Sequence, residues 1–114
     1  MGEEKDLFQS LVMELRRGSL VLCVLSCTKE PKYGYALVQS LCEKGVQTDP
    51  NTLYPLLRRL ENQGLLQSRW DTGETKPRKY YTRTEYGTEI YLKLKKCWQE
   101  LSFGMDSLLK EEEI

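Results

Sequence analysis

Apolar residues at helical spacing open the chain. They recur at steps of three and four, the period of one face of an α-helix, and they predict a first helix from Leu7 to Cys27, within an N-terminal segment of residues 5–27. Gly18 is a candidate weak point inside this helix. Pro31 and Gly34 then mark a clear break in the pattern.

Two further helices follow the break. The first, within residues 33–45, has its apolar positions on one side and ends in glycine, a common C-terminal stop. The second covers residues 49–64. Thr48 or Asp49 can cap its N-terminus, and Pro50 suits its first turn, where the missing N–H costs nothing.

This third helix has two unlike faces. At about 100° per residue its leucines form one stripe, which consists of Leu53, Leu56, Leu57 and Leu60. The opposite face consists of Asn51, Pro55, Arg58 and Asn62. Pro55 removes the hydrogen-bond donor for the carbonyl of Asn51, but on the outer face that carbonyl can be hydrated or meet a ligand.

The apolar period then changes to about two residues, which is typical of strands. Residues 65–70 and 78–84 are the two predicted strands, and Gly73 and Pro77 lie in the connection between them, so a hairpin is expected. The tip and second strand carry basic residues with no acid among them, interleaved with two tyrosines. The basic residues are Lys76, Arg78, Lys79 and Arg83.

A long final helix is predicted for residues 85–112. Thr84 can cap it, and Glu85 lies in its first turn. Its apolar stripe consists of Ile90, Leu94, Cys97 or Trp98, Leu101, Met105 and Leu108. This stripe has little of its own small domain to pack against, so it is expected to meet another subunit, with the first helix completing the interface. A hairpin with the first helix of the same chain is the alternative.

The order of these elements is that of a winged helix-turn-helix. The expected fold is mostly α with a small two-stranded β wing, as a single domain of residues 1–114 whose DNA-binding region is residues 33–84. In this architecture the helix after the turn enters the major groove and the wing reaches the DNA backbone or minor groove. Cations for phosphate and amides, hydroxyls or guanidinium groups for bases are all present on these two elements.

The charge distribution agrees with a nucleic-acid partner. The net charge of the 114 residues is zero. From Arg58 to Lys96, however, ten basic and five acidic residues leave an excess of five positive charges, balanced by acidic ends. A winged-helix module that binds another protein, without DNA, is the alternative, and it would favour an apolar or acidic recognition face.

Enzymatic function is not expected. The chain has no histidine, and its carboxylates are scattered, so no nucleophile, base or metal cluster can be assembled. We therefore expect no catalytic residue, no metal and no cofactor. The four cysteines are expected to be small buried apolar residues, with redox sensing as the alternative.

The N-terminus carries acids and no apolar segment of the signal-peptide type. The longest apolar run, Leu20 to Leu25, is too short to span a bilayer. A cytoplasmic protein without a membrane partner is therefore predicted, with its cysteines reduced.

Four ordered segments resemble the PadR-type transcriptional regulators. They are RRGSLVLCVL (16–25), YGYALVQSL (33–41), NTLYPLLRRLENQGLL (51–66) and RKYYTRTEYGTEI (78–90). The resemblance covers about Arg16 to Leu109, and the short C-terminus is similar to the branch with a single C-terminal helix. It implies a homodimeric repressor that binds an inverted-repeat operator in double-stranded DNA.

Site residues follow from the same resemblance. In the family the Tyr-Pro helix and the wing contact DNA, while the first and last helices dimerise. The positions implied for DNA contact are Tyr35, Asn51, Thr52, Tyr54, Pro55, Arg58, Arg59, Lys76, Arg78 and Lys79. The positions implied for the dimer or ligand region are Leu94, Trp98, Leu101, Met105 and Leu108.

An aromatic effector is also implied. In multidrug-responsive members a tryptophan of the last helix stacks on flat aromatic ligands at the dimer interface, 14 residues after the threonine that opens TExG. Trp98 stands 14 residues after Thr84. Packing of Trp98 within the interface, without a ligand, is the alternative.

Overall fold

The computed structural model describes residues 2–73 and 76–111 of the chain. Within these residues the order is α1 (Gly2–Arg16), α2 (Ser19–Cys27), β1 (Lys32–Tyr33), α3 (Gly34–Glu43), α4 (Pro50–Asn62), β2 (Leu66–Asp71), β3 (Arg78–Arg83) and α5 (Glu85–Glu111). Position 112 of the predicted last helix and positions 74 and 75 of the predicted hairpin connection lie outside the described residues. The predicted fold class, mostly helical with a small antiparallel sheet, is confirmed.

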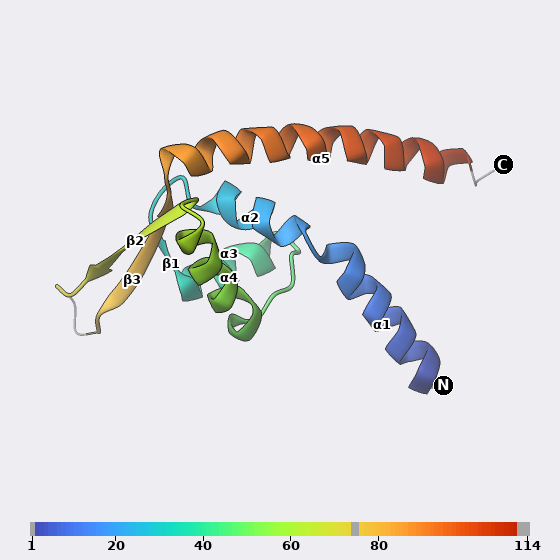
Figure 1. Cartoon of the computed structure of the whole chain (residues 1–114). Coiled ribbons are helices and arrows are strands. Elements are labelled where there is room, and N and C mark those ends of the chain that lie inside the picture. Colours follow the sequence, from blue (N-terminus) through green and yellow to red (C-terminus); the bar gives the residue numbers. More distant parts are fainter. Residues whose placement is uncertain (1, 74–75, 112–114) are drawn as a thin grey trace.

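The N-terminal helix is interrupted at Gly18, which corrects the single helix predicted for residues 5–27. Gly18 has a φ of 77°, in the left-handed region that glycine adopts without a Cβ penalty. The Ser19 hydroxyl donates to the carbonyl of Arg16 across the break (2.7 Å). Because the left-handed conformation of Gly18 breaks the helix, the axes of α1 and α2 point in different directions (Figure 1).

The core lies where α2, α3 and α4 meet the sheet. Its buried residues are Val24, Leu25, Leu37, Leu41, Leu53, Leu57, Leu60, Leu65, Leu66 and Tyr81. Fully burying each leucine contributes about 1.5–3 kcal/mol. Thr28 is the buried polar residue here, and its hydroxyl donates to the carbonyl of Val24 (2.9 Å), so it carries no unpaired group into the core.

Helix α4 confirms the expected cap and the expected faces. The Asp49 carboxylate accepts a hydrogen bond from the backbone N–H of Thr52 (2.9 Å). Three leucines of the predicted stripe are buried and Leu56 is half-buried. Pro55 lies inside the helix and is exposed on the other side. Asn51, whose carbonyl loses its usual donor at position 55, is exposed as well, so the missing hydrogen bond costs little there.

The sheet has three strands in the order β1-β3-β2, so the predicted two-stranded hairpin gains a strand. Strands β2 and β3 pair antiparallel from Leu66 opposite Arg83 to Asp71 opposite Arg78. The added strand β1 sets Tyr33 opposite Tyr80. A strand of two residues is too short to show the alternation of apolar and polar positions, so β1 could not be predicted from its sequence.

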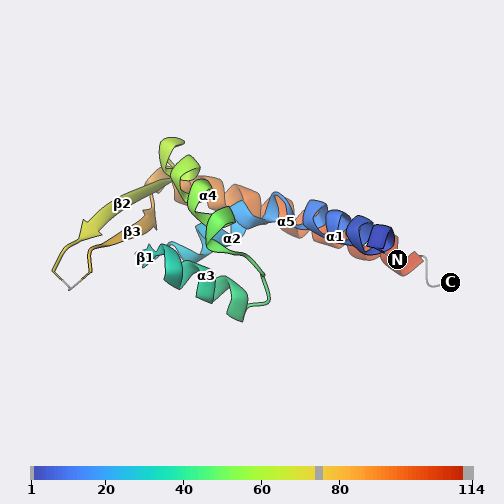
Figure 2. The same ribbon diagram turned by 90° about the horizontal axis from the view of Figure 1, so that it is seen from below.

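Helix α5 extends beyond the domain. Its 27 residues span about 40 Å, and α2 packs under its first part while α1 diverges from it (Figure 1). The radius of gyration is 16.8 Å, against roughly 13 Å for a compact chain of this length. Seen from below, the wing projects from one end of the domain, and α1 and the second half of α5 project from the other (Figure 2). In the part of the chain that the structure describes, α1 does not pack along α5 as a hairpin.

Candidate nucleic-acid interface

The outer face of α4 carries exposed polar side chains. The positions predicted for DNA contact on this helix are Asn51, Thr52, Tyr54, Pro55, Arg58 and Arg59, and all are exposed. They are held outward because the leucines of the opposite face are fixed in the core. Asn51, Pro55 and Arg58 share the centre of the face, whereas Arg59 lies on one flank. This face combines amide, hydroxyl and guanidinium groups on one rigid helix.

Tyr54 connects α4 to α3. Its ring lies so close to Gly34, the first residue of α3, that a Cβ at position 34 would come within 3.0 Å of Cζ and closer still to Cε1. Tyr54 is nevertheless 39% exposed. The ring therefore packs against the start of α3, while part of Tyr54 remains exposed to solvent. Tyr35, the next residue of α3, is also exposed.

Arg78 is oriented by aromatic side chains of the sheet. Its guanidinium carbon lies 4.5 Å from the centre of the Tyr33 ring. Tyr33 in turn packs edge to face on Tyr80, with ring centres 5.5 Å apart. This stacking leaves the planar donors of Arg78 at the surface, where it is exposed like Lys76. Tyr33 was not predicted to have this role, because the pairing of β1 with β3 was not anticipated.

Lys79 is tied to α4. Its ammonium nitrogen lies 3.5 Å from a carboxylate oxygen of Glu61, and both side chains are 31% exposed. The other carboxylate oxygen accepts a hydrogen bond from the Ser68 hydroxyl of β2. Although the basic run of the wing contains no acid in sequence, the fold supplies one from the helix. Glu61 thus joins both wing strands to α4 and reduces the positive charge available at Lys79.

Arg83, the fourth basic residue of the wing, points inward. It is half-buried at the end of β3, and its guanidinium donates to the carbonyl of Leu25 (2.7 Å) and to the hydroxyl of Thr88 (3.0 Å). Its guanidinium is therefore bound to α2 and α5 and is not part of the charged surface of the wing tip.

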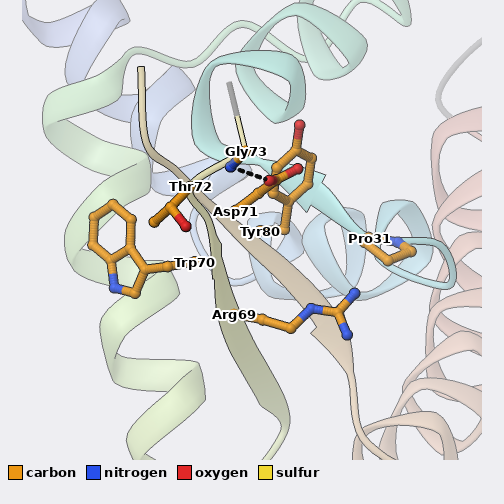
Figure 3. Close-up of a pocket in the computed structure, with 7 residues that line it drawn as sticks. All are labelled: Pro31, Arg69, Trp70, Asp71, Thr72, Gly73 and Tyr80. Carbon is orange, nitrogen blue, oxygen red and sulfur yellow. Dashed lines mark hydrogen bonds between the residues drawn. The ribbon is translucent and has the colours of Figure 1, made fainter. Parts of the chain in front are cut away.

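A wide pocket of about 590 Å³ lies on the wing (Figure 3). Its lining residues are Pro31, Arg69, Trp70, Asp71, Thr72, Gly73 and Tyr80. Asp71 accepts a hydrogen bond from the N–H of Gly73 (3.0 Å), which shapes the turn after β2. In the part of the chain that the structure describes, no group of three His, Cys, Asp or Glu side chains is placed to bind a metal ion.

The stripe predicted for the dimer or ligand region projects from the domain. Leu94 is half-buried against the core. Beyond it the stripe is exposed, and its exposed members are Trp98, Leu101, Met105 and Leu108. Helix α1 also exposes a large apolar set, which includes Leu7, Phe8, Leu11 and Leu15. Among the residues that the structure describes, α1 and α5 thus both leave large apolar side chains exposed.

The cysteines are free thiols in different surroundings. Cys23, Cys27 and Cys42 are half-buried, and Cys97 is exposed, which departs from the buried positions expected for all four. Burial, together with the neighbouring Cys27, raises the pKa of the Cys23 thiol above its ordinary value. A raised pKa lowers the thiolate fraction at neutral pH, which opposes a redox role for Cys23.

A helix-turn-helix followed by an antiparallel wing, with polar residues on the outer face of the second helix, defines a winged helix-turn-helix protein. Residues 21–93, well over half of the chain, match the model of the transcriptional regulator PadR-like family. The chain belongs to this family of transcriptional regulators, which is not enzymatic.

Individual relatives support the assignment. The chain is 31% identical over 90 residues to the transcriptional regulator Rv3488 of Mycobacterium tuberculosis, covering 78% of this chain and 84% of the relative. It is 50% identical to a PadR family transcriptional regulator of known structure from Eggerthella lenta, with a TM-score of 0.86 and coverage of 96% and 97% of the two chains.

The fold is also shared with Bacillus subtilis PadR, whose structure was determined in complex with operator DNA. The TM-score is 0.63 at 23% identity, over 68% of this chain and 46% of the other. Among the described residues of the present chain, no helix is both long and apolar enough to cross a membrane.

Proposed function

We propose that the chain is a homodimeric repressor that binds an inverted-repeat operator. The observation that carries the proposal is the outer face of α4, where Asn51 and Arg58 are exposed opposite the buried leucines. Asparagine pairs with adenine and arginine with guanine in the major groove. A module for a protein partner would present an apolar or acidic face, and this one is polar and basic.

The wing adds phosphate contacts to this face. Lys76 and Arg78 are exposed at the wing, and cations at this place suit the DNA backbone beside the groove that α4 enters. Tyr35, Thr52, Tyr54, Pro55, Arg59 and Lys79 complete the proposed contact set. Bacillus subtilis PadR, which shares the fold, has been crystallised with its operator, and this supports the same placement of DNA here.

Dimerisation would cover the apolar surfaces of α1 and α5. Trp98 is 49% and Leu101 is 56% exposed, and neighbouring apolar side chains of this size are rarely left in water by a soluble protein. A second copy related by a two-fold axis would bury these stripes and set the two α4 helices at half-sites roughly 34 Å apart.

An aromatic effector would bind in this interface. Trp98 offers a large flat ring partway along α5, and such a ring stacks on flat aromatic molecules. If the effector favours one arrangement of the two protomers, it shifts operator affinity through that preference. Repression is proposed as the outcome of operator occupancy.

Titration of the purified protein against DNA from upstream of its own gene, at several salt concentrations, tests the proposal. We expect a dimer, and an affinity that falls steeply as salt rises because bound cations displace counterions. R58A should bind the operator more weakly, by about 1–3 kcal/mol, while remaining a folded dimer. K110A is the charge-matched control, because Lys110 lies near the far end of α5. Absent or salt-insensitive binding would refute DNA recognition.

A further inference from the structure

Arg83 connects three elements at the junction between the DNA-binding half and α5. Its backbone N–H donates to the carbonyl of Thr28 (2.8 Å) and its Nη1 to the carbonyl of Leu25 (2.7 Å), both at the end of α2. Its Nε donates to the hydroxyl of Thr88 in the first turns of α5 (3.0 Å). The guanidinium carbon lies 4.4 Å from the centre of the Tyr91 ring, one turn further along α5.

These contacts suit a guanidinium and no other side chain. The carbonyl of Leu25 belongs to the last turn of α2, the negative end of the helix dipole, which attracts a cation. The planar fork then reaches a hydroxyl with a second donor while its face stacks on an aromatic ring. A lysine at this position would keep the charge but lose one of these directional bonds.

A second anchor holds the start of α5 to the other side of the domain. The Thr84 hydroxyl donates to the carbonyl of Gly64 (2.6 Å), and its backbone N–H donates to the carbonyl of Leu65 (3.1 Å). A Cβ at Gly87 would overlap the Leu65 carbonyl, so the helix is seated closely there. A helix held at one end only can pivot about that point. Arg83 supplies the second fixed point, on α2.

We infer that Arg83 sets the angle at which α5 leaves the DNA-binding half, and thereby the operator spacing that the dimer accepts. The inference rests on the proposed dimeric function. Apolar packing of α2 on α5 tolerates small rotations, whereas the Arg83 hydrogen bonds are directional and lose strength when the angle changes. Arg83 is thus a positioning residue that determines specificity without touching DNA.

The geometry makes a small angular change important. From Glu85 to Leu101, in the exposed stripe, α5 spans about 24 Å at 1.5 Å per residue. A tilt of about 10° over this lever moves one DNA-binding half relative to the two-fold axis by about 4 Å. The rise between base pairs is about 3.4 Å. If the angle were not fixed, the half-site spacing that the dimer accepts would therefore vary by about one base pair for each protomer.

Binding to operators of varied spacing tests the inference. The operator from upstream of the gene is rebuilt with its half-sites moved together or apart in single base-pair steps, and the wild type is compared with R83M. We expect wild type to show a sharp optimum. R83M should bind the optimal operator about tenfold more weakly, the effect of a lost charged hydrogen bond, yet bind the neighbouring spacings and an isolated half-site as well as wild type does.

Two further variants keep the result interpretable. T88V removes the acceptor on α5 and leaves Arg83 in place. It should therefore broaden the spacing optimum, though less than R83M does. If R83M does not fold, the spacing optimum of T88V tests the role of Arg83 instead. K93M removes one positive charge from an exposed site on α5 and should leave the optimum unchanged.

The outcomes separate the two proposals. A variant whose affinity falls by the same factor at every spacing and at the half-site, or whose optimum stays as sharp as that of wild type, would overturn the role of Arg83 alone. Wild-type protein without any spacing optimum would overturn the proposed dimeric function together with it.

Discussion

The ring of Tyr54, on α4, packs directly against Gly34, on α3, in the proposed DNA-binding motif. The ring of Tyr54 occupies the space in which any Cβ at position 34 would lie. Because Gly34 begins α3 and Tyr54 lies in the second turn of α4, this contact sets how near the two helices approach. It also leaves part of the tyrosine exposed on the outer face.

Substitution of Gly34 by alanine should therefore destabilise the protein. The added methyl group forces either the ring or α3 to move, and such overpacking typically costs 1–3 kcal/mol, so we expect a loss of about that size. Chemical denaturation measures it. In the double variant G34A/Y54A the methyl group has room, so the two costs should not add.

Gly104 provides the matched control. It lies inside α5, and an added Cβ would meet nothing within 4 Å. G104A should therefore stabilise the protein or leave it unchanged, because alanine favours the helix by up to about 1 kcal/mol over glycine. A loss of stability in G104A as large as in G34A would contradict the steric argument.

Glu61 should restrain DNA binding through Lys79. E61Q removes the negative charge near the proposed interface and releases Lys79, while the amide oxygen can still accept from Ser68. We expect operator affinity to rise up to about fivefold at low salt, the effect of one exposed ion pair. The salt dependence should steepen by about one counterion. Fluorescence anisotropy across a salt series measures both.

The control for this prediction is E89Q, which removes the same charge from an exposed position on α5. E61Q should cost little unfolding free energy, because partly exposed ion pairs contribute at most about 1 kcal/mol. If E61Q weakened binding while remaining folded, Glu61 would instead be needed to hold the wing in place.

The helix and the wing should contribute to binding in different ways. R58A should lose about 1–3 kcal/mol on the operator and little on unrelated DNA, because base contacts carry sequence information. K76A should weaken both by a similar factor, as expected for a phosphate contact. Competition between operator and unrelated DNA measures the ratio. An unchanged ratio in R58A would place Arg58 at the phosphates.

Sequence was sufficient for the parts of the fold in which local pattern and packing agree. Helix α4 has a capping aspartate directly before its first residue, a first-turn proline and a leucine stripe, and each was confirmed. The break at Gly18 was harder to predict, because the flanking segments both favour helix and only the φ of 77° ends α1. The short strand β1 is created by pairing with a strand almost 50 residues away.

The candidate site followed the same division. The exposed face of α4 could be predicted from helical phase. The environment of the wing cations could not, because Glu61 and Lys79 are 18 positions apart in sequence and meet only once the hairpin packs on α4. Arg83 turns inward because it shares a strand face with the buried Tyr81. Lys79 and Arg83 lie on either side of Tyr81 on this face, and nothing in the sequence distinguishes the one that turns inward.

The half-buried thiol of Cys23 predicts a loss of stability at alkaline pH. Its pKa is raised in the folded chain, by burial first and by Cys27 second. The unfolded chain therefore releases this proton at lower pH than the folded chain does. The contribution is fully present below the unfolded pKa and is lost as pH rises through the folded pKa.

C23A should remove this part of the pH dependence, so that its unfolding free energy falls less steeply above neutral pH than that of wild type. C97A, at an exposed position, should follow wild type. Denaturation at a series of pH values under reducing conditions measures the difference, and parallel curves for wild type and C23A would show that Cys23 titrates alike in both states.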